Sequence, residues 1–173
     1  MNLSINCGSK APIWESSTPF FLTRYPLIRN GKPRLIPGTS YQKDGPEHQA
    51  LKALCYLPQL DLNPKDCQFQ ADQQGLVMLA DSKIIAIATA QLWSQSGRWQ
   101  VERKHGRKTL ESGFRVRFMF PTSLCGPIGL GYSAHFGLGC MRPLDNTRPR
   151  SNEAENLERI SPFESHGLMV AGH

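Results

Sequence analysis

A glycine-rich segment near the C-terminus contains the residue types of a phosphate-binding loop. Residues 126–139 read GPIGLGYSAHFGLG, in which the unit glycine–hydrophobic–glycine occurs twice, five residues apart. Glycine adopts positive φ values, lets a ligand backbone approach closely and exposes N–H groups that bind phosphates. The candidate binding residues are Gly129, Gly131, His135, Gly137 and Gly139. A flexible turn is the alternative interpretation.

Two well-known nucleotide-binding loops do not fit this segment. A Walker loop requires Gly-Lys-Ser/Thr at its end, and that sequence does not follow here. The dinucleotide-binding fingerprint requires three glycines in the pattern Gly-x-Gly-x-x-Gly, and Gly137 comes too late for it. The segment therefore predicts contact with a phosphate backbone rather than a mononucleotide or dinucleotide cofactor, and we expect no cofactor.

Positive charge is concentrated immediately before the glycine-rich segment. Residues 98–120 contain seven Lys or Arg and two acids, a local net charge of +5 in a chain whose net charge is +6. The stretches RWQVERK and GFRVRFMF alternate in polarity, which predicts half-buried strands at 98–104 and 114–120, joined as a hairpin. The candidate phosphate-binding cations are Arg103, Lys104, Arg107, Lys108, Arg115 and Arg117. Charges that protect an edge strand would give the same pattern, so both interpretations stay open.

The remaining elements are expected in a simple order. The apolar run at 18–22 predicts a strand. Residues 46–57 predict the clearest helix, because Pro46 and Glu47 suit a first turn and leucines recur at helical spacing. Residues 59–97 favour strands, since Ile and Val recur, and 138–142 a final strand. The sequence thus predicts an α+β domain over 1–143, followed by a polar tail over 144–173.

Composition narrows the class of protein. The 173 residues suit one domain with a tail, and a pI near 9.2 admits a nucleic-acid partner. No apolar run approaches the roughly 20 residues of a membrane-spanning helix, and the N-terminus lacks the apolar core of a secretory signal. The five cysteines occur singly, without CxxC, which argues against a zinc ribbon or a disulfide framework. We therefore expect a cytoplasmic protein with no bound metal.

The order of motifs resembles the RAMP superfamily, the RNA-binding proteins of CRISPR systems. The resemblance is closest to the Cas-six-like C-terminal half of the fused Cas-five/Cas-six protein of type I-U (I-G) systems. It spans about 14–143, although the fused proteins are much longer and their N-terminal half has no counterpart here. The matching features are the Phe/Arg alternation at 114–120, Gly126-Pro127, the run His135-Phe136-Gly137-Leu138-Gly139, and Trp14, Thr18 and Pro19 upstream.

This resemblance implies a fold and a chemistry. The fold is ferredoxin-like, as in RNA-recognition motifs, with an antiparallel sheet and a C-terminal glycine-rich loop. The family cleaves CRISPR repeat RNA without metal: the ribose 2′-hydroxyl attacks the neighbouring phosphate, which leaves a 2′,3′-cyclic phosphate. A histidine usually transfers the proton, so His48, His105 and His135 are candidate catalytic residues. His48 and His105 could equally be exposed residues, and His135 could stack on RNA or pack within the loop.

Three functions follow from the resemblance. The first is an endoribonuclease that processes CRISPR RNA, or a RAMP subunit that holds the crRNA. The second is a non-catalytic scaffold subunit of a guide-RNA effector complex. The third is a mobile-element mimic of such a subunit. The implied partners are CRISPR repeat RNA and other Cas subunits of a type I effector complex.

Overall fold

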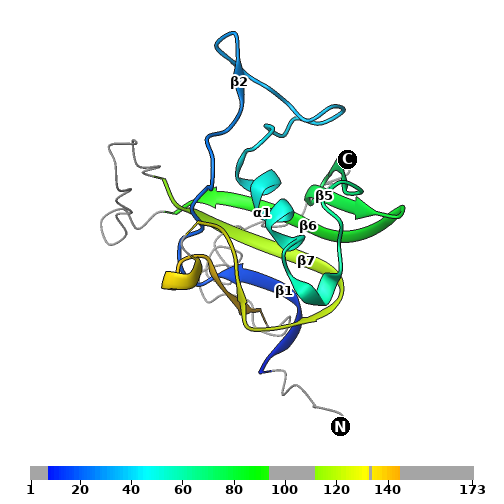
Figure 1. The fold of residues 1–173 in the computed structure, drawn as a ribbon, viewed down its shortest axis with the longest axis vertical. Coiled ribbons are helices and arrows are strands. Elements are labelled where there is room, and N and C mark those ends of the chain that lie inside the picture. Colours follow the sequence, from blue (N-terminus) through cyan, green and yellow to red (C-terminus); the bar gives the residue numbers. More distant parts are fainter. Residues whose placement is uncertain (1–7, 94–111, 133, 145–173) are drawn as a thin grey trace, which may run out of the picture.

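The computed structural model describes residues 8–93, 112–132 and 134–144, which form one antiparallel sheet with a helix on one face (Figure 1). The sheet has seven strands in the order β4-β5-β6-β7-β1-β9-β8. Their bounds are β1 Lys10–Ser16, β4 Gln68–Asp72, β5 Gly75–Ala80, β6 Lys83–Leu92, β7 Phe114–Cys125, β8 Ile128–Gly129 and β9 Cys140–Pro143. A small hairpin, β2 (Ile28–Arg29) and β3 (Lys32–Pro33), stands apart from this sheet.

The helix α1 (Pro46–Leu54) packs against β5, β6 and β7. Pro46 occupies the first turn, where its missing N–H costs no hydrogen bond, and Glu47 lies near the positive end of the helix. Leu51 and Leu54 are fully buried and face the sheet as one apolar stripe. Short 3-10 turns, η1 (Pro58–Leu60) and η2 (Ala134–Phe136), complete the helical elements of the described residues.

The strand register assigns each side chain of the central strands to one of two faces. Trp14, Phe118, Ala88 and Leu76 lie in one row across β1, β7, β6 and β5, and all four belong to the core cluster that includes the buried residues of α1. Neighbouring residues along each strand point to the opposite face. We call that opposite face, over β6, β7, β1 and β9, the arginine face, since it carries Arg115, Arg117 and Arg142.

The sequence-based expectations for the helix and for the central region are largely confirmed. The helix begins at Pro46 as expected and ends at Leu54, and η1 begins at Pro58. Residues 59–97 contain the strands β4, β5 and β6. The β5–β6 hairpin turns at Asp81 and Ser82, both with positive φ, as the two-residue type I′ turn requires. The last strand, β9, begins two residues after the expected position.

The expected first strand, at residues 18–22, is wrong. The strand that enters the sheet is β1, Lys10–Ser16, and Phe20 forms only an isolated bridge with Phe114. Pro12 and a register shift between Ala11 and Ile13 break the alternation of β1 and conceal it in the sequence.

The expected hairpin of 98–104 with 114–120 is also wrong in its pairing. β7 covers the second stretch and continues to Cys125, but it pairs with β6 on one side and with β1 and Phe20 on the other. Residues 98–104 lie outside the described residues, as does the predicted tail beyond Leu144.

Two further findings concern the cysteines and the membrane. Cys125 is disulfide-bonded, whereas Cys55, Cys67 and Cys140 are free thiols. Within the described ranges, no helix combines the length and the apolar character needed to cross a membrane.

Candidate nucleic-acid interface

A buried carboxylate between two arginines forms the centre of the arginine face. Glu15 on β1 is 2% exposed and lies opposite Arg117 of β7 and Arg142 of β9. Arg117 donates to Glu15 Oε2 from Nη2 at 2.9 Å and from Nε at 3.2 Å, and Arg142 Nη2 lies 3.4 Å from Oε1. The two arginine side chains remain 41% and 56% exposed. Three neighbouring strands therefore present two guanidinium groups that one carboxylate holds in place.

A third arginine extends this surface along β7. Arg115 lies two residues before Arg117, opposite Gln91 of β6, and its guanidinium carbon is 5.1 Å from the centre of the Trp93 ring. Such cation–π contact orients a guanidinium while leaving its N–H groups available for hydrogen bonding. The described part of the arginine face thus carries three arginines against one carboxylate, a charge that suits phosphates.

The glycine-rich segment folds back onto the chain between β1 and Phe21. The Gly139 N–H donates to the Pro19 carbonyl at 2.9 Å, and the Tyr132 N–H donates to the Phe21 carbonyl at 3.1 Å. A Cβ at Gly131 would lie 2.6 Å from the Phe20 ring, and one at Gly139 would overlap the Leu130 carbonyl oxygen. Gly131 and Gly139 are therefore required by packing within the protein.

The other two predicted glycines are not needed for packing. A Cβ at Gly137 would meet no atom within 4 Å, and one at Gly129 would only touch Ala134. The Gly137 N–H, however, donates to the Ala134 carbonyl at 3.0 Å. The amides of Gly137 and Gly139 are thus already engaged within the protein, so the segment offers a ligand its exposed surface around Gly137 rather than these two N–H groups.

Thr18 fixes the glycine-rich segment to β9, and sequence analysis gave it no such role. Its hydroxyl donates to the Gly137 carbonyl at 2.8 Å and accepts the Cys140 N–H at 2.9 Å. Ser17 adds a second link, because both its N–H and its hydroxyl donate to the Cys140 carbonyl. The only signal in the sequence was the Thr-Pro pair of the resemblance.

His135 lies on the surface of the glycine-rich segment. It belongs to η2, is exposed, and its ring centre is 4.1 Å from that of Phe136, with 46° between the ring planes. Phe136 itself is 78% exposed. An exposed pair of rings is a surface on which an unpaired base can stack, and the imidazole is accessible for proton transfer.

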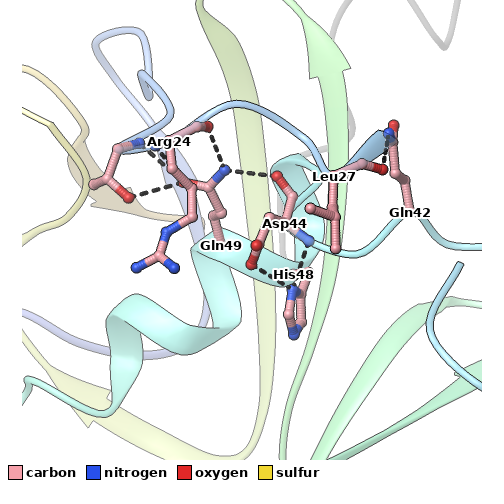
Figure 2. A network of polar contacts seen from close by, with 7 residues as sticks. Arg24, Leu27, Gln42, Asp44, His48 and Gln49 are labelled. Atoms are coloured by element: carbon pink, nitrogen blue, oxygen red, sulfur yellow. Dashed lines mark hydrogen bonds and ion pairs between the residues drawn. The ribbon is translucent and has the colours of Figure 1, made fainter. Parts of the chain in front are cut away.

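His48, by contrast, is 5% exposed and belongs to the core side of the sheet. Its Nδ1 accepts the Asp44 N–H at 2.9 Å (Figure 2), and its ring meets Phe69 edge-on at 4.6 Å. Burial, reinforced by the positive charge of Lys52, lowers its pKa from 6.5 to about 4. Because α1 covers the face opposite the arginines, the structure does not bring His48 together with Arg115 and Arg117.

The remaining predicted site residues are Arg103, Lys104, His105, Arg107 and Lys108, and all of them lie outside the described residues. Conversely, sequence analysis missed Glu15 and Arg142. Neither belongs to a motif, and only the pairing of β1 with β7 and β9 brings them to Arg117.

Comparison with known proteins adds no relative. No protein-family model matches the chain, and neither do the curated proteins or the solved structures with which it was compared.

Proposed function

We propose that this chain is an RNA-binding protein of the RAMP type, which holds CRISPR repeat RNA or the crRNA against its arginine face. The observation that carries the proposal is the arrangement of Arg115 and Arg117 on β7 and of Arg142 on β9, the two strands that flank β1, on one face of the sheet. Arginine binds phosphates through a planar fork of donors, and proteins with an RNA-recognition fold bind RNA on an open sheet face.

The strand order supports a ferredoxin-like core for this proposal. In a ferredoxin-like βαββαβ unit the first strand lies between the third and the fourth, and the second lies beside the third. The strands β6, β7, β1 and β9 follow that order, all of them antiparallel, and α1 comes after β1 in the chain. The glycine-rich segment, with β8 and η2, lies between β7 and β9 in the chain, where a ferredoxin-like unit has its second helix, and β4 and β5 extend the sheet beyond β6.

Metal-independent cleavage of the bound RNA is the second candidate function, and the exposure of His135 favours it. His135 can reach a ligand, whereas the 5% exposed His48 cannot do so without opening of the core. If the chain only holds RNA, it is a scaffold subunit of a guide-RNA complex or a mimic of one.

A single experiment tests both functions. Labelled CRISPR repeat RNA is incubated with the protein in EDTA under single-turnover conditions, and binding and cleavage are followed on gels. We expect binding, weakened at least severalfold in Arg115→Gln and unchanged in Lys83→Gln, an exposed cation at the start of β6. No binding by the wild type would refute the proposal. If RNA is cut, His135→Ala should lower the rate about 10²–10⁴-fold with unchanged affinity, and a wild type that binds without cutting would favour the scaffold.

A further inference from the structure

A basic arm stands out from the rest of the described protein. It comprises residues 24–43, which lie between β1 and α1 in the chain, and it contains the β2–β3 hairpin. Figure 1 shows it extending away from the sheet, with β2 at its far end. We call these residues the arm.

The charge of the arm is entirely positive. It contains Arg24, Arg29, Lys32, Arg34 and Lys43, and there is no acid anywhere between residues 16 and 43. The first four are exposed and Lys43 is half-buried. In the described ranges no ion pair involves any of these five side chains, unlike Arg117 and Arg142 on the sheet. A surface of this kind attracts a polyanion and repels basic partners.

Apolar side chains are interleaved with these cations. Tyr25, Ile28 and Leu35 are 56%, 63% and 48% exposed, and each of them is next to an arginine in the sequence. Cations that meet phosphates, next to rings and aliphatic groups that meet bases, are typical of surfaces that bind single-stranded nucleic acid. A protein partner of ordinary mixed charge fits less well, because a surface with five cations and no acid is complementary to a ligand that is negative along its whole length.

The arm is a built element with its own hydrogen bonds. Asn30 and Gly31, with φ of 52° and 73°, form the tight turn between β2 and β3. Nearer to the body of the protein, three backbone hydrogen bonds of 2.7–2.9 Å connect Leu27, Arg34 and Lys43. The Leu27 N–H donates to the Lys43 carbonyl, the Lys43 N–H to the Arg34 carbonyl, and the Arg34 N–H to the Leu27 carbonyl. The backbone that carries the cations of the arm is therefore held by its own hydrogen bonds.

Gln49 of α1 joins the two ends of the arm (Figure 2). Its Oε1 accepts the N–H groups of Thr23 and Arg24, and its Nε2 donates to the carbonyls of Arg24, at 2.8 Å, and Asp44, at 2.6 Å. Gln49 is 6% exposed, so these bonds are shielded from water. A surface that is held in place before binding loses less conformational entropy when the ligand binds.

We propose that the arm is a second nucleic-acid binding site, which contacts phosphates of an RNA strand beyond the sheet. This inference rests on the proposed RNA-binding function and extends it to residues outside the arginine face. The class of ligand follows from the positive charge, which forms no ion pair with the described residues, and from the neighbouring apolar groups, which together fit a single-stranded polynucleotide.

The test compares two triple variants of equal charge. Arg29→Gln/Lys32→Gln/Arg34→Gln removes three cations from the arm, and Lys10→Gln/Lys65→Gln/Lys83→Gln removes three exposed lysines elsewhere. All six side chains are exposed, so both variants should fold, which circular dichroism checks. Affinity is measured between 50 and 200 mM salt for the CRISPR repeat RNA and for a poly(U) 30-mer.

The arm variant should lower the slope of log affinity against log salt by about 2, because each phosphate contact on a single strand contributes about 0.7. The control variant should shift the slope by far less. If the wild type binds and the two variants behave alike, the arm is not a nucleic-acid site, although the proposed function stands. If the arm variant weakens poly(U) binding and the wild type binds poly(U) and the CRISPR repeat RNA equally well, the arm is a nucleic-acid site but the CRISPR function is refuted. No binding of either RNA would refute both.

Discussion

Glu15 and Arg117 face each other across the β1–β7 pair, with Arg117 Nη2 2.9 Å from a carboxylate that is almost fully buried. A buried carboxylate is costly unless it is paired, and Glu15 gains its pairing from strands that are distant in sequence. The pair thus links the correct assembly of β1, β7 and β9 to the position of the guanidinium groups on the arginine face.

Removal of the Arg117 side chain should destabilise the protein more than removal of Arg142. Arg117 makes two hydrogen bonds to Glu15, and Arg142 makes one at 3.4 Å. We expect Arg117→Ala to lower the free energy of unfolding by about 2 kcal/mol and Arg142→Ala by less than 1 kcal/mol, as measured by urea denaturation. In the Glu15→Gln background the cost of Arg117→Ala should shrink. Equal costs in both backgrounds would mean that the pair contributes no stability.

Acid should weaken the wild type through His48. Because the folded protein lowers the His48 pKa from 6.5 to about 4, the unfolded chain binds the proton more readily between these values. The contribution of neutral His48 is complete above pH 6.5 and is lost as the pH falls to about 4, on the order of 3 kcal/mol in total.

The measurement is the difference in unfolding free energy between the wild type and His48→Asn across this range. Asparagine can still accept the Asp44 N–H but does not titrate. The comparison with a variant is needed because other groups also make stability depend on pH. Burial raises the pKa of Glu47, so protonation of Glu47 favours the folded state as the pH falls, which opposes the effect of His48. The pKa of His48 itself also responds to Lys52 and Lys43, which lower it, and to Asp44, which raises it. Parallel pH profiles for the two proteins would show that His48 is not protonated on unfolding.

Two glycines of the glycine-rich segment should respond differently to the same substitution. Gly139→Ala places a Cβ onto the Leu130 carbonyl at a φ of +63°, so we expect a loss of several kcal/mol or failure to fold. Gly137→Ala meets open space and should cost only about 1 kcal/mol for its φ of +84°. Thermal denaturation distinguishes them, and similar melting temperatures would contradict the packing of this segment.

A substitution at Gly137 that leaves the protein folded also tests whether the glycine-rich segment contacts RNA. Gly137→Val should remain folded yet lose RNA affinity, because a branched side chain would project from the exposed surface of the segment beside Phe136. Unchanged affinity would separate the glycine-rich segment from RNA binding and leave the arginine face and the arm as the contacts.

Loss of the Gln49 bridge should weaken RNA binding without changing its salt dependence. Gln49→Met keeps the length of the side chain but removes the oxygen that accepts from Thr23 and Arg24 and the nitrogen that donates to the carbonyls of Arg24 and Asp44, and it adds no charge. The arm should then lose its fixed position while all its cations remain. We expect faster hydrogen exchange at the Leu27, Arg34 and Lys43 amides and a severalfold lower affinity at an unchanged salt slope. A reduced slope would mean that the substitution acts on charge instead of position.

The sequence was sufficient for elements with strong local signals. The helix was predictable because Pro46, Glu47 and the leucine spacing all agree, and β7 because Phe and Arg alternate over seven residues. β1 was missed since Pro12 and its bulge remove the period, while the apolar residues Phe20 and Phe21 pack without forming a strand.

The candidate site was harder to predict, because it depends on contacts between distant residues. Arg115 and Arg117 were identified from charge alone, but Glu15 and Arg142 join them only through strand pairing. His48 was expected at an accessible helix start, whereas the chain folds Asp44 and Phe69 over it. No local pattern distinguishes a histidine that will be covered from one that stays exposed, as His135 does.

The bridge made by Gln49 brings the two ends of the arm together. Since one side-chain nitrogen reaches the carbonyls of both Arg24 and Asp44, the chain leaves and re-enters the body at nearly the same point. The tip of such an excursion, the β2–β3 hairpin, can be shortened or lengthened without altering the sheet register, whereas Ile36 has to stay because it belongs to the buried core. Evolution can therefore remodel the hairpin to suit different ligands while the body keeps its architecture.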